Sequence, residues 1–154
     1  MRFSIKTAIV TGGAGGIGLA IASRLASEGA NIVLADISME QLTKGAEVLK
    51  SQGFESVWLS QCDVSNEQQV QTTVTGAVGH FGTLEIIVNN AGLMIFKKLE
   101  ETSPDDWSRI LNVDLMGAFY FTKYAFLNMK NGRSIINISS IQALETTLMV
   151  TTYA

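Results

Sequence analysis

The sequence predicts an α/β protein built on a doubly wound parallel sheet, and three observations lead to that prediction. Short apolar runs rich in β-branched residues alternate with longer segments of helical periodicity along the 154 residues. The apolar runs are continuous, as in Ile86-Ile87-Val88, which is typical of parallel strands covered by helices on both faces. A glycine-rich turn directly follows the first run, at the point where such folds bind ligands.

The elements follow one another in a regular β-α order. We expect strands near 5–10, 31–36, 55–60, 84–89 and 133–139. We expect helices between them at about 16–28, 38–51, 66–80 and 104–130. The fourth helix has a well-defined start, because Ser103 is a typical N-cap residue and proline, here Pro104, is favoured in the first turn. Right-handed crossovers then place functional residues at the carboxyl ends of the strands.

The fourth helix carries two apolar stripes. One comprises Leu111, Leu115, Ala118, Phe119, Ala125, Phe126 and Met129, and the other comprises Val113, Gly117, Tyr120, Phe121 and Tyr124. A helix that covers one face of a sheet needs only one apolar stripe. The second stripe therefore packs either against a partner subunit or against other segments of the same molecule.

Composition and charge argue against several classes of function. Eleven Lys and Arg residues against fourteen Asp and Glu residues give a formal net charge of −3 without a basic cluster, so no nucleic-acid partner is expected. The lone Cys62 and the lone His80 supply neither an internal disulfide nor the usual ligands of a metal site, so no metal is expected. Glycines interrupt the uncharged stretch 7–23, which argues against a membrane span. The amino terminus lacks the features of a secretory leader, which predicts a cytoplasmic protein.

The glycine-rich turn is suited to a pyrophosphate, because bare glycine backbone and the free N–H groups of a helix start can approach the phosphates closely. It fits two registers, Gly13, Gly15 and Gly18 as GxGxxG, or Gly12, Gly16 and Gly18 as TGxxxGxG. A triphosphate-binding P-loop is disfavoured, because Leu19 and Ala20 follow the last glycine where Lys and Ser or Thr are required.

Asp36 ends the second predicted strand, 18 residues after the last glycine of the turn. In a dinucleotide-binding fold, a carboxylate at this place accepts hydrogen bonds from the ribose hydroxyls. It also repels a 2′-phosphate, and neither Ala14, Gly15 nor Ile37 supplies a cation to pair with one, so NAD is predicted over NADP. Alternatively, Asp36 only caps the next helix, although Ser38 is available for that purpose.

Further motifs along the chain are Cys62-Asp63-Val64, Asn89-Asn90-Ala91-Gly92, Asn112 and Ser140. Read together with Thr11-Gly12-x-x-x-Gly16-Ile17-Gly18 and Asp36, they resemble the short-chain dehydrogenases/reductases, which have a Rossmann-like fold. The resemblance selects the second glycine register, so that Gly12, Gly16, Ile17 and Gly18 hold the cofactor. It implies that Asp63 and Val64 line the adenine pocket, and that Asn90, Ala91 and Gly92 form a wall beside the cofactor's ribose.

The resemblance further implies a catalytic group of Asn112, Ser140 and Tyr153. Tyr153 follows Ser140 by 13 positions, a spacing that selects Ser140 over Ser139. Ser140 would hydrogen-bond the substrate oxygen and Tyr153 would transfer the proton, while Asn112 would hold a water in a proton relay. Asn112 interrupts an apolar helical stretch and would need a partner if buried, so a plain helix-to-loop hydrogen bond is the alternative.

The expected catalytic lysine is missing from the sequence. A free phenol has a pKa of about 10, and family members lower it with a lysine four residues after the tyrosine, which would be position 157 here. A helix that begins at 151–154 would also end within one turn. The apolar strand near 133–139 would then remain as an uncovered edge of the sheet. We therefore expect residues 1–154 to be a dinucleotide-binding domain that is incomplete at its carboxyl end.

The predicted function is NAD-dependent interconversion of a secondary alcohol and a ketone, in a homodimer or homotetramer of the complete protein. Neither the alcohol or carbonyl substrate nor the direction of the reaction is predicted. The alternative is a non-catalytic dinucleotide-binding module, or an inactive fragment that lacks the lysine.

Overall fold

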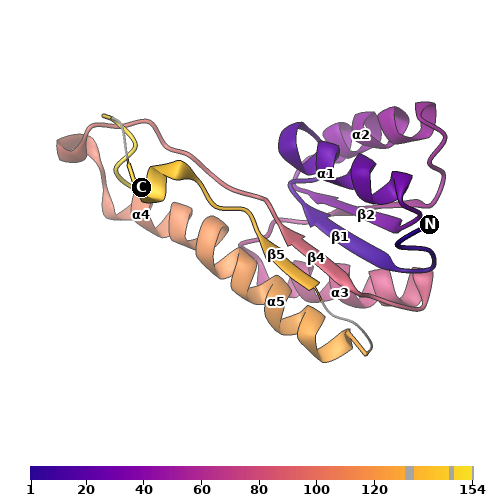
Figure 1. Cartoon of the computed structure of the whole chain (residues 1–154). Helices are drawn as coiled ribbons and strands as arrows, with labels where there is room; N and C mark the ends of the chain where they lie inside the picture. The colour runs from indigo at the N-terminus through magenta and orange to yellow at the C-terminus, as the bar shows by residue number, and fades with distance from the viewer. Residues whose placement is uncertain (131–133, 146–147, 154) are drawn as a thin grey trace.

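The centre of the molecule is a five-stranded parallel sheet (Figure 1), seen in a computed structural model that describes residues 1–130, 134–145 and 148–153. Its strands are β1 (Thr7–Thr11), β2 (Asn31–Asp36), β3 (Val57–Gln61), β4 (Ile86–Asn89) and β5 (Ser134–Asn137). Their order in the sheet is β3-β2-β1-β4-β5, and every neighbouring pair is parallel. Each strand overlaps the range expected from the sequence, and the predicted fold class is confirmed.

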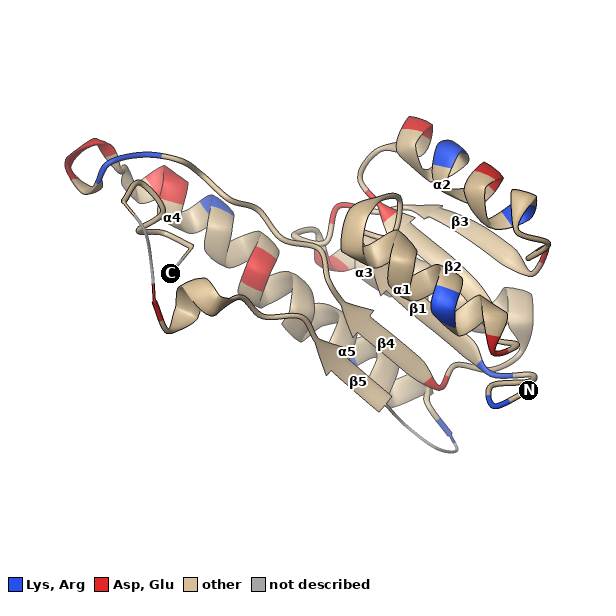
Figure 2. Ribbon diagram, turned by 45° about the horizontal axis from the view of Figure 1, so that its top comes forward, with Lys and Arg blue, Asp and Glu red and all other residues tan. Residues whose placement is uncertain are grey.

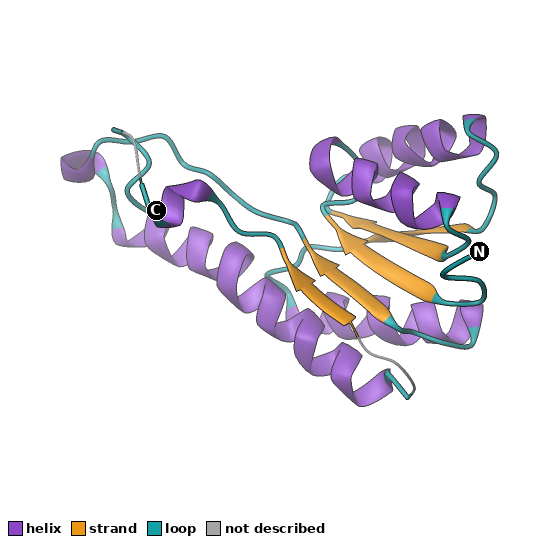
Figure 3. Cartoon of the chain, in the orientation of Figure 1, coloured by secondary structure: helices purple, strands orange, loops and turns teal. Residues whose placement is uncertain are grey.

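Helices cover both faces of the sheet (Figure 3). They are α1 (Gly16–Ser27) and α2 (Met39–Ser51) on one face, and α3 (Glu67–Phe81) and α5 (Gly117–Asn128) on the other. Side chains of the central strands alternate between the two cores: Ile9 and Val33 pack with α3 and α5, whereas Val10 and Leu34 pack with α1 and α2. Because both faces are buried, the strands read as continuous apolar runs in the sequence.

The expected single helix over 104–130 is interrupted. It begins as α4 (Pro104–Ile110), passes through the π-helical segment η2 (Leu111–Met116) and continues as α5. The start is as predicted, because the Ser103 hydroxyl accepts the Asp106 N–H at 3.2 Å and the Asp106 carboxylate accepts the Ser103 N–H at 2.9 Å. This reciprocal arrangement is a capping box.

The wide π turn changes the phase of the helix, so the two apolar stripes expected from the sequence are divided differently. One face is buried against the sheet, and it consists of Gly117, Phe121, Ala125 and Met129. The other face is exposed and carries Leu111, Leu115, Phe119 and Phe126. Ala125 and Met129 therefore belong to the buried face, contrary to the assignment from a regular 3.6-residue period.

Beyond the carboxyl ends of β4 and β5, two segments run beside α4 and extend the molecule away from the sheet (Figure 1). They contain the short 3₁₀ helices η1 (Leu99–Glu101) and η3 (Ile141–Ala143). The segments meet where the Lys97 N–H donates to the Met149 carbonyl at 2.8 Å. The expected helix over 151–154 is a turn through Tyr153, and Ala154 lies outside the described residues.

Charged side chains lie on the helices and connecting turns, and the middle of the sheet carries none (Figure 2). Strand β5 pairs only with β4 in the described part of the chain, and Ile136 in β5 and Ile138 just after it are exposed. Among the described helices, none combines the length and apolarity that crossing a membrane requires.

Candidate active site

Two adjoining pockets lie at the carboxyl ends of the strands. The first, of about 440 Å³, is lined by residues that follow β1, β2 and β3, and the second, of about 640 Å³, lies between the ends of β4 and β5 and the η2–α5 helix. Four residues line both pockets, namely Val64, Ala91, Gly92 and Val113. The chain leaves β1 for one face of the sheet and β4 for the other, so the pockets lie at the switch point where doubly wound sheets bind ligands.

The turn between the two pockets leads into α1 with unpaired backbone donors. Gly15 is the N-cap of α1 and supplies no side-chain hydrogen bond, and the first turn contains no acidic residue. By contrast, Ser38 caps α2 and Asn66 caps α3, each with an acidic residue in the first turn. The free N–H groups and the positive end of the α1 dipole therefore remain available to an anion.

The shape of this turn is fixed by Asn90 and by the absence of a side chain at Gly18. The Asn90 side-chain amide donates to the carbonyls of Thr11 at 2.9 Å and of Gly12 at 3.2 Å. A Cβ on Gly18 would lie only 2.2 Å from the Gly12 carbonyl oxygen. Gly16 has a positive φ of 52°, a backbone conformation that glycine adopts without strain. Ile17 is exposed and lines the second pocket.

Asp36 lies at the end of β2 in the wall of the first pocket. Its carboxylate accepts the Ser38 N–H at 3.2 Å and lies 3.4 Å from the Ala14 N–H. Ser38 itself caps α2 by accepting the Gln41 N–H at 3.3 Å. Asp36 is therefore not needed as the helix cap, which leaves it free for the ribose role that the sequence favours.

The opposite side of the first pocket is formed by the segment after β3 and by the helix that precedes η2. Asp63 accepts hydrogen bonds from the N–H and hydroxyl of Ser65 and lines the pocket beside Val64. Cys62 is buried in the core, and its burial raises the pKa of the thiol. Within the described residues, no three His, Cys, Asp or Glu side chains gather where they could hold a metal ion.

The second pocket brings Ser140 and Tyr153 together, although 13 residues separate them in the sequence. Ser140 follows β5, and its hydroxyl accepts the Gln142 N–H at 3.2 Å at the start of η3. Tyr153 lies in the turn after the Lys97–Val150 bridge, which joins this segment to the loop after β4. The pocket is thus closed by two segments that follow neighbouring strands.

The base of the second pocket is polar. Asn89 is buried at the end of β4, and its side-chain amide donates to Asn137 on β5 at 2.8 Å. The hydroxyl of Thr11 accepts the backbone N–H groups of Asn90 and Ala91 at 2.9 and 3.0 Å. These bonds join the ends of β1, β4 and β5, so the floor shared by the two pockets is a fixed part of the sheet.

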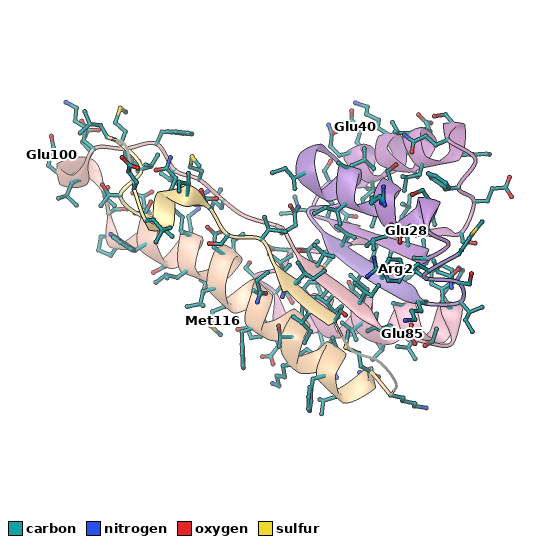
Figure 4. All side chains as sticks on the ribbon, in the orientation of Figure 1. Arg2, Glu28, Glu40, Glu85, Glu100 and Met116 are labelled. Carbon is teal, nitrogen blue, oxygen red and sulfur yellow. The ribbon has the colours of Figure 1, made fainter. Side chains whose placement is uncertain are left out.

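The structure separates Asn112 from Ser140 and Tyr153. Asn112 is exposed and lines the first pocket, so its amide needs no protein partner, contrary to what burial would have required. Asp114 lines the second pocket instead. Both residues belong to η2, which ends at Met116 (labelled in Figure 4). Of the residues expected to bind the cofactor, all except Gly16 and Gly18 line at least one of the two pockets.

Comparison with known proteins agrees with this arrangement. The family model described as short chain dehydrogenase matches residues 6–154, which is nearly the whole chain. The chain belongs to the short-chain dehydrogenase family. Among similar family members, a diacetyl reductase [(S)-acetoin forming] of Staphylococcus epidermidis is 36% identical over 97% of this chain and 59% of its own length. An NADP-dependent (R)-specific alcohol dehydrogenase of Lentilactobacillus kefiri is 38% identical over 92% of this chain and 56% of its own.

Solved structures of short-chain dehydrogenases superpose closely on the chain. A short-chain dehydrogenase/reductase from Burkholderia phymatum in complex with NAD has a TM-score of 0.92 at 31% identity, covering 99% of this chain and 55% of the other. An NAD⁺-bound xylitol dehydrogenase has the same TM-score at 34% identity, covering 99% and 60%. The chain thus spans somewhat more than half the length of the family members it matches.

Sequence reasoning missed two charged residues of the site, Arg109 in the first pocket and Asp114 in the second. Arg109 lies in α4 and Asp114 in the π-helical segment η2. Such segments, in which the N–H group bonds to the carbonyl five residues earlier, occur frequently at functional sites. The sequence gives no strong signal for a π segment, so the two residues are found only from the structure.

Proposed function

We propose that the chain is the cofactor-binding part of an NAD-dependent oxidoreductase that interconverts a secondary alcohol and a ketone. The observation that carries the proposal is the pair of adjoining pockets, one with Asp36 and the other with Ser140 and Tyr153, with the uncapped start of α1 between them. These three features match three parts of NAD. Asp36 matches the adenosine ribose, the start of α1 matches the pyrophosphate, and Ser140 and Tyr153 match the nicotinamide ring at which the hydride is transferred. The two halves of NAD would occupy the two pockets.

The residues present fit this cofactor. Asp36 would accept hydrogen bonds from the adenosine ribose, and Asp63 and Val64 would line the adenine site. Gly12, Gly16, Ile17 and Gly18 would hold the pyrophosphate at the start of α1, where a side chain on Gly18 would collide with the Gly12 carbonyl. Asn90, Ala91 and Gly92 would form the wall beside the second ribose.

The chemistry would occur in the second pocket. The bound nicotinamide would accept or donate the hydride. Ser140 would donate a hydrogen bond to the substrate oxygen, and Tyr153 would take the proton from the alcohol or return it to the ketone. The relay role that the resemblance implies for Asn112 is the part of the catalytic group that this geometry does not support, because Asn112 lines the other pocket.

Replacement of the tyrosine hydroxyl tests the proposal. In the full-length protein, Tyr153→Phe should abolish turnover of a panel of secondary alcohols and ketones, while the dissociation constant for NAD remains unchanged. Tyr120→Phe is the matched control, because Tyr120 lies on α5 and lines neither pocket, so the same loss of a hydroxyl should leave turnover intact. Undiminished turnover by Tyr153→Phe would refute the assigned mechanism.

A binding module without catalysis is the alternative function. It differs from the enzyme in one respect, since it would bind NAD at the same pockets but turn over no alcohol or ketone. Saturable NAD binding by a full-length protein with no turnover on the panel would favour it. A lysine at position 157 of the full-length protein would favour the enzyme, because the resemblance to the family implies a catalytic lysine four residues after the tyrosine.

We also propose that residues 1–154 form the dinucleotide-binding part of a longer enzyme that assembles as a homodimer or homotetramer. The curated family members are longer, and the exposed apolar face of the long helix is suited to a second copy of the protein. An intact mass of the protein well above 16.6 kDa would support the proposal that residues 1–154 are part of a longer enzyme. A stable monomer on dilution in analytical ultracentrifugation would refute the proposed homodimer or homotetramer.

A further inference from the structure

Asp114 is a carboxylate of the second pocket to which the proposed mechanism gives no role. It lies in η2, near the middle of the long helix, and lines the pocket together with Ser140 and Tyr153. One of its oxygens, Oδ1, accepts the Leu93 N–H at 2.7 Å, just after the Asn-Asn-Ala-Gly turn that ends β4. This bond fixes the carboxylate against the pocket wall and leaves its other oxygen available.

The charge of Asp114 has no cationic partner in the described part of the chain. The ion pairs found there involve Glu28, Glu40, Glu67 and Asp106. No Lys, Arg or His is among the described residues that line the second pocket, where Tyr153 is the other titratable side chain. Arg109, Asp36 and Asp63 line the first pocket. An ionised Asp114 therefore makes the second pocket negative.

We propose that Asp114 gives the second pocket a charge preference, so that the pocket holds an oxidised nicotinamide ring, which is cationic, more tightly than a reduced ring, which is neutral. The proposal rests on the proposed function, since it requires that this pocket receives the nicotinamide half of the cofactor. The adenosine and pyrophosphate parts are the same in NAD⁺ and NADH. Asp36, Asp63 and Arg109 in the first pocket therefore act alike on both forms, and the difference between them arises in the second pocket.

The preference should depend on pH. Burial raises the pKa of Asp114, and the hydrogen bond from Leu93 opposes that shift only in part. Protonation of the carboxylate would remove the attraction for the cationic ring but leave the neutral ring unaffected. The ratio of the two affinities should therefore decrease as the pH is lowered from 8 to about 4, the pKa of an ordinary aspartate, because a carboxyl with a raised pKa is more than half protonated there.

Asp114→Asn tests the proposal, because asparagine keeps an oxygen that can accept the Leu93 N–H and removes the charge. Dissociation constants for NAD⁺ and NADH would be measured on the full-length protein by calorimetry and NADH fluorescence. NAD⁺ binding should weaken about three- to tenfold with NADH binding unchanged, as expected for one charge at a partly exposed site. Asp105→Asn is the matched control, because Asp105 is exposed on α4 outside both pockets, and it should leave both constants unchanged.

The outcomes separate the inference from the proposed function. If Asp114→Asn weakens both forms equally, or neither, Asp114 has at most a structural role and the inference is refuted. If the variant does not fold, the wild-type protein still decides, because a ratio of the NAD⁺ and NADH affinities that stays constant from pH 8 to about 4, the pKa of an ordinary aspartate, also refutes the inference. If the wild-type protein binds neither form, the proposed function fails, and the inference fails with it.

Discussion

The close packing of Gly18, in the first turn of α1, against the turn that precedes the helix yields a prediction whose size follows from the structure. In Gly18→Ala, the new Cβ would lie 2.2 Å from the Gly12 carbonyl oxygen and 2.6 Å from the Asn90 amide nitrogen. Ordinary van der Waals contact begins at 3.4 Å, so the helix and the turn must separate by about 1 Å. Relief of such overpacking costs about 1–3 kcal/mol.

This cost should appear in cofactor binding, because the displaced backbone is the part that would hold the pyrophosphate. Since 1.4 kcal/mol corresponds to a factor of ten, we expect NAD affinity to decrease by about tenfold to hundredfold. Isothermal titration calorimetry on the full-length protein would measure it, with circular dichroism to verify that the variant is folded.

Gly15→Ala is the matched control. A Cβ at Gly15 has no atom within 4 Å, and the backbone there is extended, with φ of −164°. The same added methyl group, three residues earlier, should therefore change NAD affinity by no more than about twofold. Wild-type affinity in Gly18→Ala, or an equal loss in Gly15→Ala, would refute the assignment of this turn to the pyrophosphate.

Three further predictions concern the first pocket, the core and the capping box. Asp36→Ala should lower the affinity for NAD and raise that for NADP, because the carboxylate that repels a 2′-phosphate is removed while Arg109 remains in the pocket; competition binding with both cofactors checks this. Phe121→Ala should lower the free energy of unfolding by about 3–5 kcal/mol, because the ring is fully buried between α5 and the sheet; urea denaturation checks this. Hydrogen bonds from Lys97 and then Ser103 lower the pKa of Asp106 to about 2, so its contribution to stability is present above the ordinary value of about 4 and is lost as the pH falls toward 2; the acid dependence of the urea midpoint should be shallower in Asp106→Asn.

The sheet and the glycine-rich turn could be predicted from the sequence because each is indicated by residues that are neighbours along the chain. Continuous apolar runs such as Ile86-Ile87-Val88 need only neighbouring residues to be recognised, and the glycines between Thr11 and Leu19 lie directly after the first run. The carboxyl ends of parallel strands meet at one edge. The ends of β2 and β5 therefore bring Asp36 and Ser140 to the same side of the sheet without further information.

The long helix could not be predicted in the same way, because its faces depend on an irregularity that the sequence does not mark. A regular period grouped Ala125 with Leu111 and Leu115, whereas in the structure Ala125 is buried in the core and Leu111 and Leu115 are exposed. Asn112 and Asp114 both belong to the π-helical segment η2, and they line different pockets. The pocket to which each polar residue of the segment belongs is therefore known only from the structure.

The central claim is that one dinucleotide spans both pockets across the start of α1. An electron-density map of the full-length protein crystallised with NAD would test it most directly. The account predicts density for the adenosine ribose beside Asp36 and for the nicotinamide ring in the pocket of Ser140 and Tyr153. Density for the cofactor elsewhere, or pockets that stay empty at saturating NAD, would contradict it.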